Sequence, residues 1–318
     1  MARRVHVASP GPRTTVEDLG RRMVARHGVP AGGAFDALSL VAANRLVGND
    51  DADAGLEATL GGPTLDNAGD EPVHVALVGA DCAATIASAG GSRPAALGRA
   101  HCLAPGEVLR MGFARDGARV WIALAGGVDV PPVLGSRSTS LAASFGGLEG
   151  RALRRGDLLR LGAPRRAPLG TSWHEPGPAA PVTLRVLPGP QLDRFAGGAL
   201  DALCATRWAV RNESDRTGVR LAPAEDGDVS PLRGAAGIAP EGTTLGAMQV
   251  PPDGCPILLG PDRPVTGGYA KPAVLAAADV GRLARLRPGD GVRFVVVSLD
   301  EACALLRARR APLEALGA

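Results

Sequence analysis

Glycine and proline interrupt this sequence at short intervals, and this pattern limits the folds that the chain can adopt. The 318 residues include 44 glycines and 27 prolines, scattered between short apolar runs such as HVALVGA (74–80) and VWIALAGGV (120–128). Short apolar runs bounded by turn residues are typical of strands joined by tight turns. Apolar residues make up 45% of the chain, enough for a substantial core. The sequence predicts a mainly β protein with a few helices, of the α+β class.

Two repeated patterns suggest that the chain has two related halves. A strand followed by Pro-Gly-Pro occurs at 4–12 and 183–190, and a turn followed by a strand occurs at 103–112, 153–162 and 286–295. Such turns also recur in unrelated β proteins, so coincidence is the alternative. Residues 163–181 lose all periodicity. We expect an N-terminal β-rich half at 1–165, a linker at 166–181 and a C-terminal half at 182–318.

Helical periodicity is confined to a few segments. Asp36 or Ser39 can cap a helix that runs to about Val47, with Gly48 just beyond its end. Further helices are expected at 191–204, at 280–286, and from about Asp300 to a stop near Pro312.

Charge and composition argue against several classes of function. The net charge is +3, no basic block occurs and aromatic residues make up 3%, so nucleic acid is not an expected partner. No signal-peptide core or membrane-length apolar run is present. The five cysteines are widely spaced without metal-ligand patterns, which favours free thiols in a reducing compartment and no metal site. We therefore expect a cytoplasmic protein without membrane contact.

The segment at 261–272, PDRPVTGGYAKP, contains the only lysine, Lys271, and the only tyrosine, Tyr269. The other 34 of the 35 basic residues are arginines. Lysine, unlike arginine, readily shifts its pKa when it is desolvated, so a single retained lysine is a candidate for chemistry. Gly267 and Gly268 would let backbone N–H groups approach a ligand closely. The alternative is an ordinary exposed lysine in a loop.

Two other polar clusters can hold an anion. Residues 212–216 form a polar turn between two expected strands, and Arg216 and Arg220 would share one face of an extended segment. A solvated hairpin tip is the alternative. In the first half, Asp18 and Arg21 lie between two turns, and residues 135–139 (GSRST) offer hydroxyl and N–H donors. A plain polar loop explains the second cluster equally well.

Nine motifs occur in order along nearly the whole chain: TTVEDLGR, GVPAGGAFD, AANRLVGN, LEATLGGPTL, AGGVDVPPVLGSRST, PGPQLDRF, ESDRTGVRL, GAMQVPPDG and DRPVTGGYAK. With these motifs the chain resembles the biotin-dependent carboxyltransferase / allophanate hydrolase subunit 2 family. The resemblance implies two cyclophilin-like β-barrel halves with the active-site cleft between them. Three positions depart from the family pattern, because Thr217 replaces a Met, Pro240 a Ser and Ala270 a Pro.

The resemblance also implies a function. Free-standing chains of this length in the family open 5-oxo-L-proline to L-glutamate with ATP and Mg²⁺, as one hydrolase subunit working with 5-oxoprolinase subunits A and B. Fused relatives of the urea amidolyase type are carboxyltransferases that use a biotinylated partner, and another relative is a non-catalytic regulator that antagonises a kinase inhibitor. Both remain alternatives. This chain has no Met-Lys-Met, so it cannot carry biotin itself.

Rarity and position select the candidate site residues, and their roles are hypotheses. Lys271 and Arg216 would bind phosphate or carboxylate charge, and Asp215 or Asp262 would act as a base or a metal–phosphate ligand. The four candidate catalytic residues are Lys271, Asp215, Arg216 and Asp262. The candidate substrate- and ATP-binding residues are Asn212, Ser214, Arg220, Gln249, Gly267, Gly268, Tyr269, Asp18, Arg21, Ser136, Ser138 and Thr139.

Overall fold

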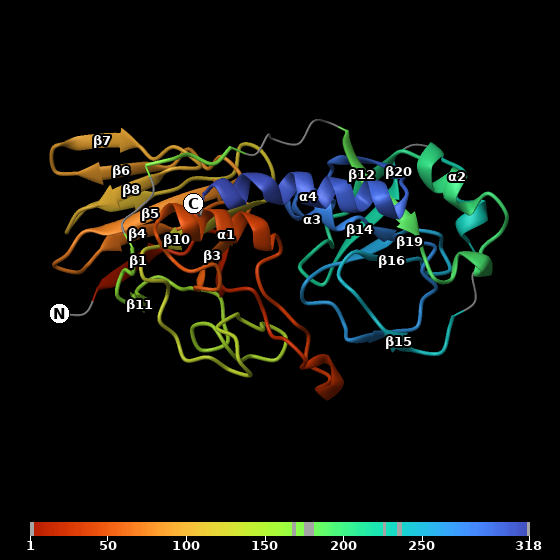
Figure 1. The fold of residues 1–318 in the computed structure, drawn as a ribbon, viewed down its shortest axis with the longest axis horizontal. Coiled ribbons are helices and arrows are strands. Elements are labelled where there is room, and N and C mark those ends of the chain that lie inside the picture. Colours follow the sequence, from red (N-terminus) through yellow and green to blue (C-terminus); the bar gives the residue numbers. More distant parts are fainter. Residues whose placement is uncertain (1–2, 167–169, 175–180, 225–226, 234–236, 317–318) are drawn as a thin grey trace. The chain divides into compact units, whose positions relative to one another are not determined.

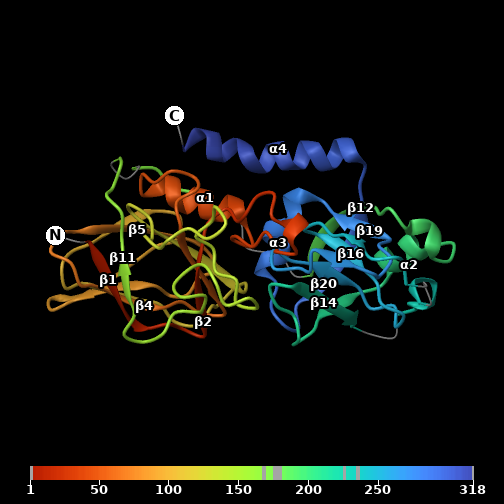
Figure 2. The same ribbon diagram turned by 90° about the horizontal axis from the view of Figure 1, so that it is seen from below.

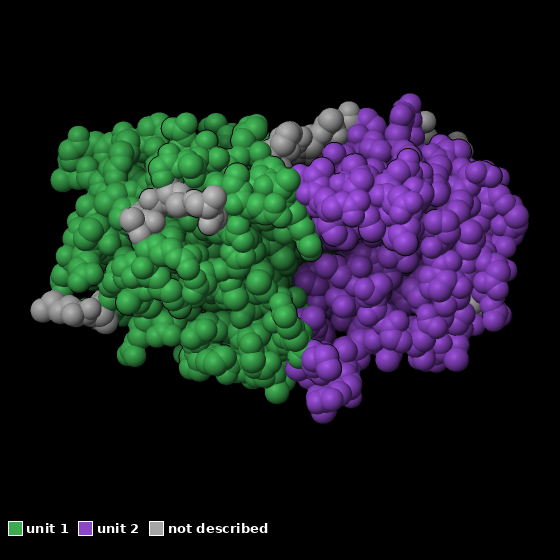
Figure 3. All heavy atoms as spheres, in the orientation of Figure 1, with its two compact units in different colours: residues 1–22, 32–177, 310–318 green, residues 23–31, 178–309 purple. Residues whose placement is uncertain are grey.

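The chain divides into two compact units. The computed structural model describes residues 3–166, 170–174, 181–224, 227–233 and 237–316. One unit comprises Met1–Arg22, Gly32–Gly177 and Arg310–Ala318, and the other comprises Met23–Ala31 and Pro178–Arg309 (Figure 3). We expected boundaries at 165 and 182 around a linker, and that linker falls largely outside the described residues. Both units are built mainly from strands, which confirms the predicted fold class.

The first unit contains two antiparallel sheets (Figure 1). The six-stranded sheet has the order β11-β1-β4-β9-β6-β7 and the five-stranded sheet the order β2-β3-β10-β5-β8. Their strands are β1 (Arg4–Ser9), β2 (Arg13–Glu17), β3 (Gly55–Thr59), β4 (Thr64–Asn67), β5 (Val73–Gly79), β6 (Thr85–Ser88), β7 (Gly91–Pro94), β8 (Ala100–Leu103), β9 (Val108–Arg110), β10 (Arg119–Leu124) and β11 (Leu158–Arg160).

Side-chain alternation explains how these sheets bury a core. In β1, Val5 and Val7 are fully buried whereas Arg4 is exposed, as expected for a strand with one wet face. β10 is buried along its whole length, because the helix α1 (Ala37–Leu46) packs against β10 and β5 on the face opposite the core between the sheets (Figure 2). A second apolar cluster fills the space between α1 and the five-stranded sheet, and it includes Val41 and Leu46 of α1.

The second unit is a closed seven-stranded barrel of order β12-β19-β16-β17-β14-β13-β20. Its strands are β12 (Val182–Pro188), β13 (Trp208–Val210), β14 (Gly218–Pro223), β16 (Ala247–Gln249), β17 (Ile257–Leu259), β19 (Ala273–Leu275) and β20 (Gly291–Val296). The parallel pairing of β12 with β20, from Val182↔Val292 to Val186↔Val296, closes the barrel. A separate two-stranded sheet pairs β15 (Glu241–Gly242) with β18 (Thr266–Gly267).

Two of the expected helices are confirmed and two differ from the prediction. The helices are α1, α2 (Ala199–Ala205), α3 (Val280–Arg285) and α4 (Leu299–Ala315), with 3-10 turns η1 (Ala25–His27), η2 (Leu192–Arg194), η3 (Ser230–Leu232) and η4 (Ala277–Asp279). The predicted helix at 191–204 is confirmed only in its second part, α2, because Gly198 adopts a positive φ of 82° and separates η2 from α2.

The predicted stop at Pro312 is also wrong. Helix α4 continues through Pro312 to Ala315. Proline removes one N–H and crowds one carbonyl, but this part of the helix is exposed, so water can satisfy the freed carbonyl. Leu313 and Leu316 beyond it are buried in the apolar cluster of α1, and this burial favours continuation of the helix.

The three repeated turns share one structure. In each, a carboxylate accepts a hydrogen bond from the backbone N–H three residues earlier, at 2.7–2.8 Å. The pairs are Ala104 with Glu107, Arg154 with Asp157, and Arg287 with Asp290. The glycine before each acid has a positive φ (Gly106 76°, Gly156 92°, Gly289 86°), a conformation that glycine adopts without strain. Two of these turns lie in the first unit and one in the second, so the motif occurs in both units.

Candidate functional site

The backbone of Lys271 is positioned by the Pro-Gly-Pro segment that follows β12. Gly189 donates its N–H to the carbonyl of Pro272 at 2.7 Å, and Gln191 donates its N–H to the carbonyl of Lys271 at 3.2 Å. In return, the N–H of Lys271 donates to Oε1 of Gln191 at 3.2 Å. A Cβ at Gly189 would overlap the carbonyl oxygen of Lys271, so only glycine permits this approach. Two of the sequence motifs therefore pack against each other around Lys271.

The side chain of Lys271 is buried and paired with a carboxylate. Lys271 is 4% exposed, and its Nζ lies 2.7 Å from Oε1 of Glu241. The same carboxylate accepts a hydrogen bond from Nε2 of Gln191 at 3.0 Å. The Lys271 ammonium, and then the Gln191 amide, hold the pKa of Glu241 below its ordinary value. The alternative of an ordinary exposed lysine is thus wrong for this chain.

Gln249 places an unsatisfied donor beside this pair. Gln249 ends β16 and is 7% exposed, and its Nε2 has no hydrogen-bond partner among the described residues. Gly267 lies against that nitrogen, because a Cβ at this position would overlap Nε2. Gly267 also pairs across the small sheet with Glu241. A buried donor without a partner costs about 1–3 kcal/mol, so it is notable in a folded protein.

A second charged pair joins the turn before β14 to the loop before β18. Arg216 is 4% exposed and contacts Asp262 through two hydrogen bonds, Nε to Oδ2 at 2.8 Å and Nη2 to Oδ1 at 3.1 Å. The N–H of Asp262 also donates to the carbonyl of Arg216 at 3.1 Å. Nearby in sequence, Arg263 has a buried Nε without a partner among the described residues, and burial lowers its pKa. Asp262 thus forms an ion pair with Arg216.

The polar side chains Asp215 and Ser214 in the turn at 212–220 hydrogen-bond to the backbone of the same turn. Oδ1 of Asp215 accepts from the N–H groups of Thr217 at 2.8 Å and Gly218 at 3.2 Å. Ser214 Oγ both donates to the carbonyl of Arg220 and accepts from its N–H. The predicted shared face of the two arginines is wrong, because Arg220 is exposed on β14 whereas Arg216 is buried in the turn before it.

The remaining predicted residues of this unit lie at its surface. Asn212 is exposed at the tip of the turn, and Tyr269 is 44% exposed beside Gly268. The carbonyl of Gly268 accepts a hydrogen bond from the N–H of Ile238 at 2.9 Å. Ligand binding by these residues stays a prediction.

In the first unit, the donors predicted to hold an anion surround an internal carboxylate, Asp18. The hydroxyl groups of Ser136 and Ser138 each donate to Oδ1 of Asp18 at 2.6 Å. The N–H of Arg137 donates to Oδ2 at 2.6 Å, and the N–H of Gly20 donates to Oδ1 at 2.8 Å. Asp18 is 7% exposed, so its charge is held inside the protein by four hydrogen bonds.

Arg21 and Thr139 join the same loops. Arg21 Nε donates to the carbonyl of Val133 at 3.2 Å, Nη2 donates to the carbonyl of Ser138, and the guanidinium lies 4.7 Å from the ring centroid of Phe145. Thr139 Oγ1 donates to the carbonyl of Val16 at 2.9 Å. The structure therefore gathers all five predicted residues of this half into one cluster that fixes the loop at 133–150.

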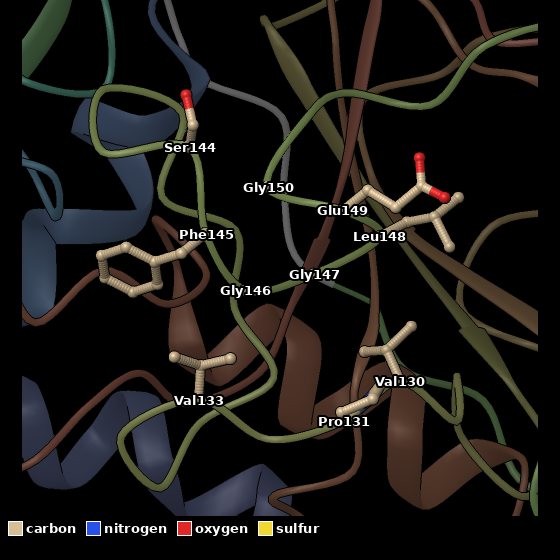
Figure 4. A pocket seen from close by; sticks show the side chains of 10 residues that line it. All are labelled: Val130, Pro131, Val133, Ser144, Phe145, Gly146, Gly147, Leu148, Glu149 and Gly150. Carbon is tan, nitrogen blue, oxygen red and sulfur yellow. The ribbon is translucent and has the colours of Figure 1, made fainter.

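The fixed loop lines an open pocket of about 470 Å³ (Figure 4). Its wall consists of Val130, Pro131, Val133 and the run Ser144–Gly150. Ser144 and Glu149 have positive φ values of 53° and 57°, unusual for residues with a side chain. Figure 4 shows the isopropyl groups of Val130 and Val133 pointing toward the glycine-rich segment. The pocket is mostly apolar, with no buried charge among its lining residues.

Sequence reasoning missed three residues of the Lys271 region. Glu241 follows Pro240, where the family pattern has Ser-Glu-Gly, so the pattern offered a signal. Gln191 is one of only two glutamines, the rarity that singled out Gln249. Arg263 gave no signal, since it is one of 34 arginines. Across the part of the chain that the structure describes, no group of three or more His, Cys, Asp or Glu side chains is arranged to hold a metal ion.

A match to a protein family covers both units. The family model described as "Carboxyltransferase domain, subdomain A and B" matches residues 27–296, most of the chain. The chain therefore belongs to the carboxyltransferase domain family with subdomains A and B.

Individual proteins similar to this chain include a curated relative and two solved structures. The chain is 36% identical over 307 residues to the C subunit of 5-oxoprolinase from Escherichia coli K12, and the match covers 94% of this chain and 92% of that protein. Among solved structures it resembles TTHA0988 (TM-score 0.79, 34% identity, 92% of this chain) and the K. lactis urea amidolyase (TM-score 0.85, 28% identity, 99% of this chain). The chain spans 56% of the first structure's chain and 20% of the second.

Proposed function

We propose that this chain is a subunit of an ATP-dependent 5-oxoprolinase, a hydrolase that opens the cyclic amide of 5-oxo-L-proline to L-glutamate together with subunits A and B. The similarity to the C subunit of 5-oxoprolinase over nearly the full length of both proteins supports this assignment. The observation that carries the proposal is the buried ammonium of Lys271, in the same unit as a buried Gln249 whose Nε2 has no hydrogen-bond partner among the described residues. A carboxylate and a lactam carbonyl are the two hydrogen-bond-accepting groups of the substrate, and these side chains offer a charge and a donor to such groups.

Three residues of the site have proposed roles. Lys271 holds negative charge on the substrate, and Gln249 donates to an oxygen of the substrate. Arg216, fixed by Asp262, maintains the loop that carries Gly267 and Gly268. ATP with Mg²⁺ would supply phosphoryl activation of the amide oxygen, which makes the ring carbonyl susceptible to water. Because the proposed reaction consumes ATP, we place it in the cytoplasm.

Reconstitution tests the proposal. The chain is combined with subunits A and B, and L-glutamate release from 5-oxo-L-proline is measured with ATP and Mg²⁺. Lys271→Arg should lower kcat/KM by about 10-fold or more, because the wider guanidinium does not fit the buried ammonium position and charged hydrogen bonds are worth about 1.5–3 kcal/mol. Arg293→Lys, an exchange at an exposed arginine of β20, serves as the control. Activity of Lys271→Arg near that of the wild type would remove the special role of the lysine.

A second candidate function follows from the family match. The family is named for carboxyl transfer, and the fold matches part of a urea amidolyase. In this alternative the chain moves a carboxyl group from biotin carried on a partner chain, since its only lysine, Lys271, lies in Ala-Lys-Pro rather than Met-Lys-Met. Avidin, which sequesters biotin, would then abolish the activity of the complex, whereas 5-oxoprolinase activity would be insensitive to avidin.

A further inference from the structure

The cation of Lys271 is buried, but the anion that neutralises it is not. Lys271 is 4% exposed and its Nζ is shielded from solvent, whereas the side chain of Glu241 is 45% exposed. Glu241 lies on β15, a strand of only two residues outside the barrel sheet. The barrel thus supplies a fixed cation, and a short surface strand supplies the carboxylate that covers it.

A second buried donor, on Gln249, lies close to the strand that carries Glu241. Nε2 of Gln249 is buried without a hydrogen bond among the described residues. It lies against the backbone of Gly267, which pairs with Glu241 across the small sheet. The Lys271 ammonium thus contacts the Glu241 carboxylate, and the Gln249 amide nitrogen lies against the cross-strand partner of Glu241. A carboxylate has two oxygens, so a ligand carboxylate can accept hydrogen bonds from both Lys271 and Gln249. Glu241 instead uses one oxygen, Oε1, for both of its contacts, with Lys271 and with Gln191.

We propose that Lys271 and Gln249 form a subsite for the carboxylate of a small-molecule ligand, and that Glu241 occupies this subsite until the ligand carboxylate displaces it. This inference rests on the proposed function in one respect, the identity of the ligand as 5-oxo-L-proline. The site takes a carboxylate rather than a phosphate because it offers one positive charge, while the neighbouring Arg216 is bonded to Asp262.

Displacement exchanges one anion for another, so Lys271 never lies buried without a counter-ion. Glu241 moves from a half-exposed position into water, where its charge is well solvated. The ligand carboxylate gains the Gln249 donor that Glu241 leaves unused. Glu241 is thus an internal competitor that keeps the subsite neutral when it holds no ligand.

The competition gives a distinctive prediction for binding to the full-length chain. Saturation-transfer NMR titrations are run with 5-oxo-L-proline, with its carboxylate-free analogue pyrrolidin-2-one, and with sodium acetate. Glu241→Gln should bind both carboxylates more tightly, with Kd lowered by about 5-fold or more, because the competing charge is gone. Gln249→Leu should raise Kd by about 10-fold, and Lys271→Met should abolish carboxylate binding. Glu71→Gln removes an exposed charge that lies 3.7 Å from Arg3 in the other unit, and should leave Kd unchanged.

Several results would overturn the proposal. Unchanged or weaker carboxylate binding in Glu241→Gln would make Glu241 a supporting residue rather than a competitor. Equal binding of pyrrolidin-2-one and 5-oxo-L-proline would show that the carboxylate is not recognised, and absence of acetate binding in every variant would remove the subsite. If Lys271→Met does not fold, as judged by thermal unfolding, Gln249→Leu decides. The titrations need neither ATP nor partners, so a reconstituted complex that forms no glutamate refutes the proposed function while acetate still tests the subsite.

Discussion

Replacing Asp18 by asparagine tests how much a single buried carboxylate contributes to the first unit. Its Oδ1 accepts three hydrogen bonds and its Oδ2 accepts one, from the N–H of Arg137 at 2.6 Å. An asparagine that keeps its carbonyl oxygen at the Oδ1 position must turn its NH₂ group toward the Arg137 N–H. One hydrogen bond to a charged group is lost, which costs about 1.5–3 kcal/mol, and two donors then face each other. We expect a loss of about 3 kcal/mol in the free energy of unfolding.

Urea denaturation followed by tryptophan fluorescence measures this loss, since Trp121 and Trp173 are buried in the same unit as Asp18. A loss of that size corresponds to a fall in Tm of about 6–12 °C for a unit of this length. Asp129→Asn is the matched control, because Asp129 is exposed and lies 3.7 Å from Arg137. If Asp18→Asn is as stable as Asp129→Asn within about 0.5 kcal/mol, the four-bond network does not hold the loop.

Three other perturbations follow from buried groups. Asp279→Asn leaves the charge of Arg185 without the carboxylate that accepts a hydrogen bond from its Nε at 2.8 Å, and should cost about 3–5 kcal/mol in urea denaturation. A cost under about 1 kcal/mol would contradict this. Arg263→Met removes an unpaired buried donor and one 3.3 Å hydrogen bond, so the same assay should show a change within about 1 kcal/mol, and a larger loss would reveal a partner. Burial raises the pKa of Cys82 to about 11, so at pH 8 Ellman's reagent should modify exposed Cys102 quickly and Cys82 only after unfolding. Since the folded pKa of Cys82 exceeds the unfolded one, its contribution to stability is complete below about pH 9 and is lost as the pH rises toward 11.

The sequence is sufficient to predict many of the strands but not how they pair. Alternating side chains identify β1, and the turns with a glycine before an acidic residue locate the starts of β9, β11 and β20. Those signals are local, because they depend on residues within one strand or turn. The parallel contact of β12 with β20 joins segments more than 100 residues apart, and no local pattern encodes it. The same distinction explains Pro312, where distant packing of Leu313 outweighs a local helix breaker.

The residues of the candidate site were likewise predicted only in part from the sequence. Rarity identified Lys271 and Gln249, because a sequence rich in arginine, glycine and alanine keeps such side chains sparingly. It did not identify Glu241, since one glutamate among 32 acidic residues is not distinctive. Its contact with Lys271 exists only because the β15–β18 pairing brings it there. Asp18 was predicted as a ligand-binding residue, and the structure shows its carboxylate bonded to the protein itself.

The closure of the barrel by β12 and β20 also has a consequence for biosynthesis. The first barrel strand leaves the ribosome roughly 100 residues before the strand that completes its pairing. Until then its edge, Val182–Pro188, carries unpaired N–H and C=O groups and apolar side chains, the features that lead to misassociation of nascent chains. Contacts of such high sequence separation also form slowly. The C-terminal unit should therefore acquire its fold only after synthesis has passed Val296, in one late step, whereas the sheets of the first unit can begin to pair much earlier.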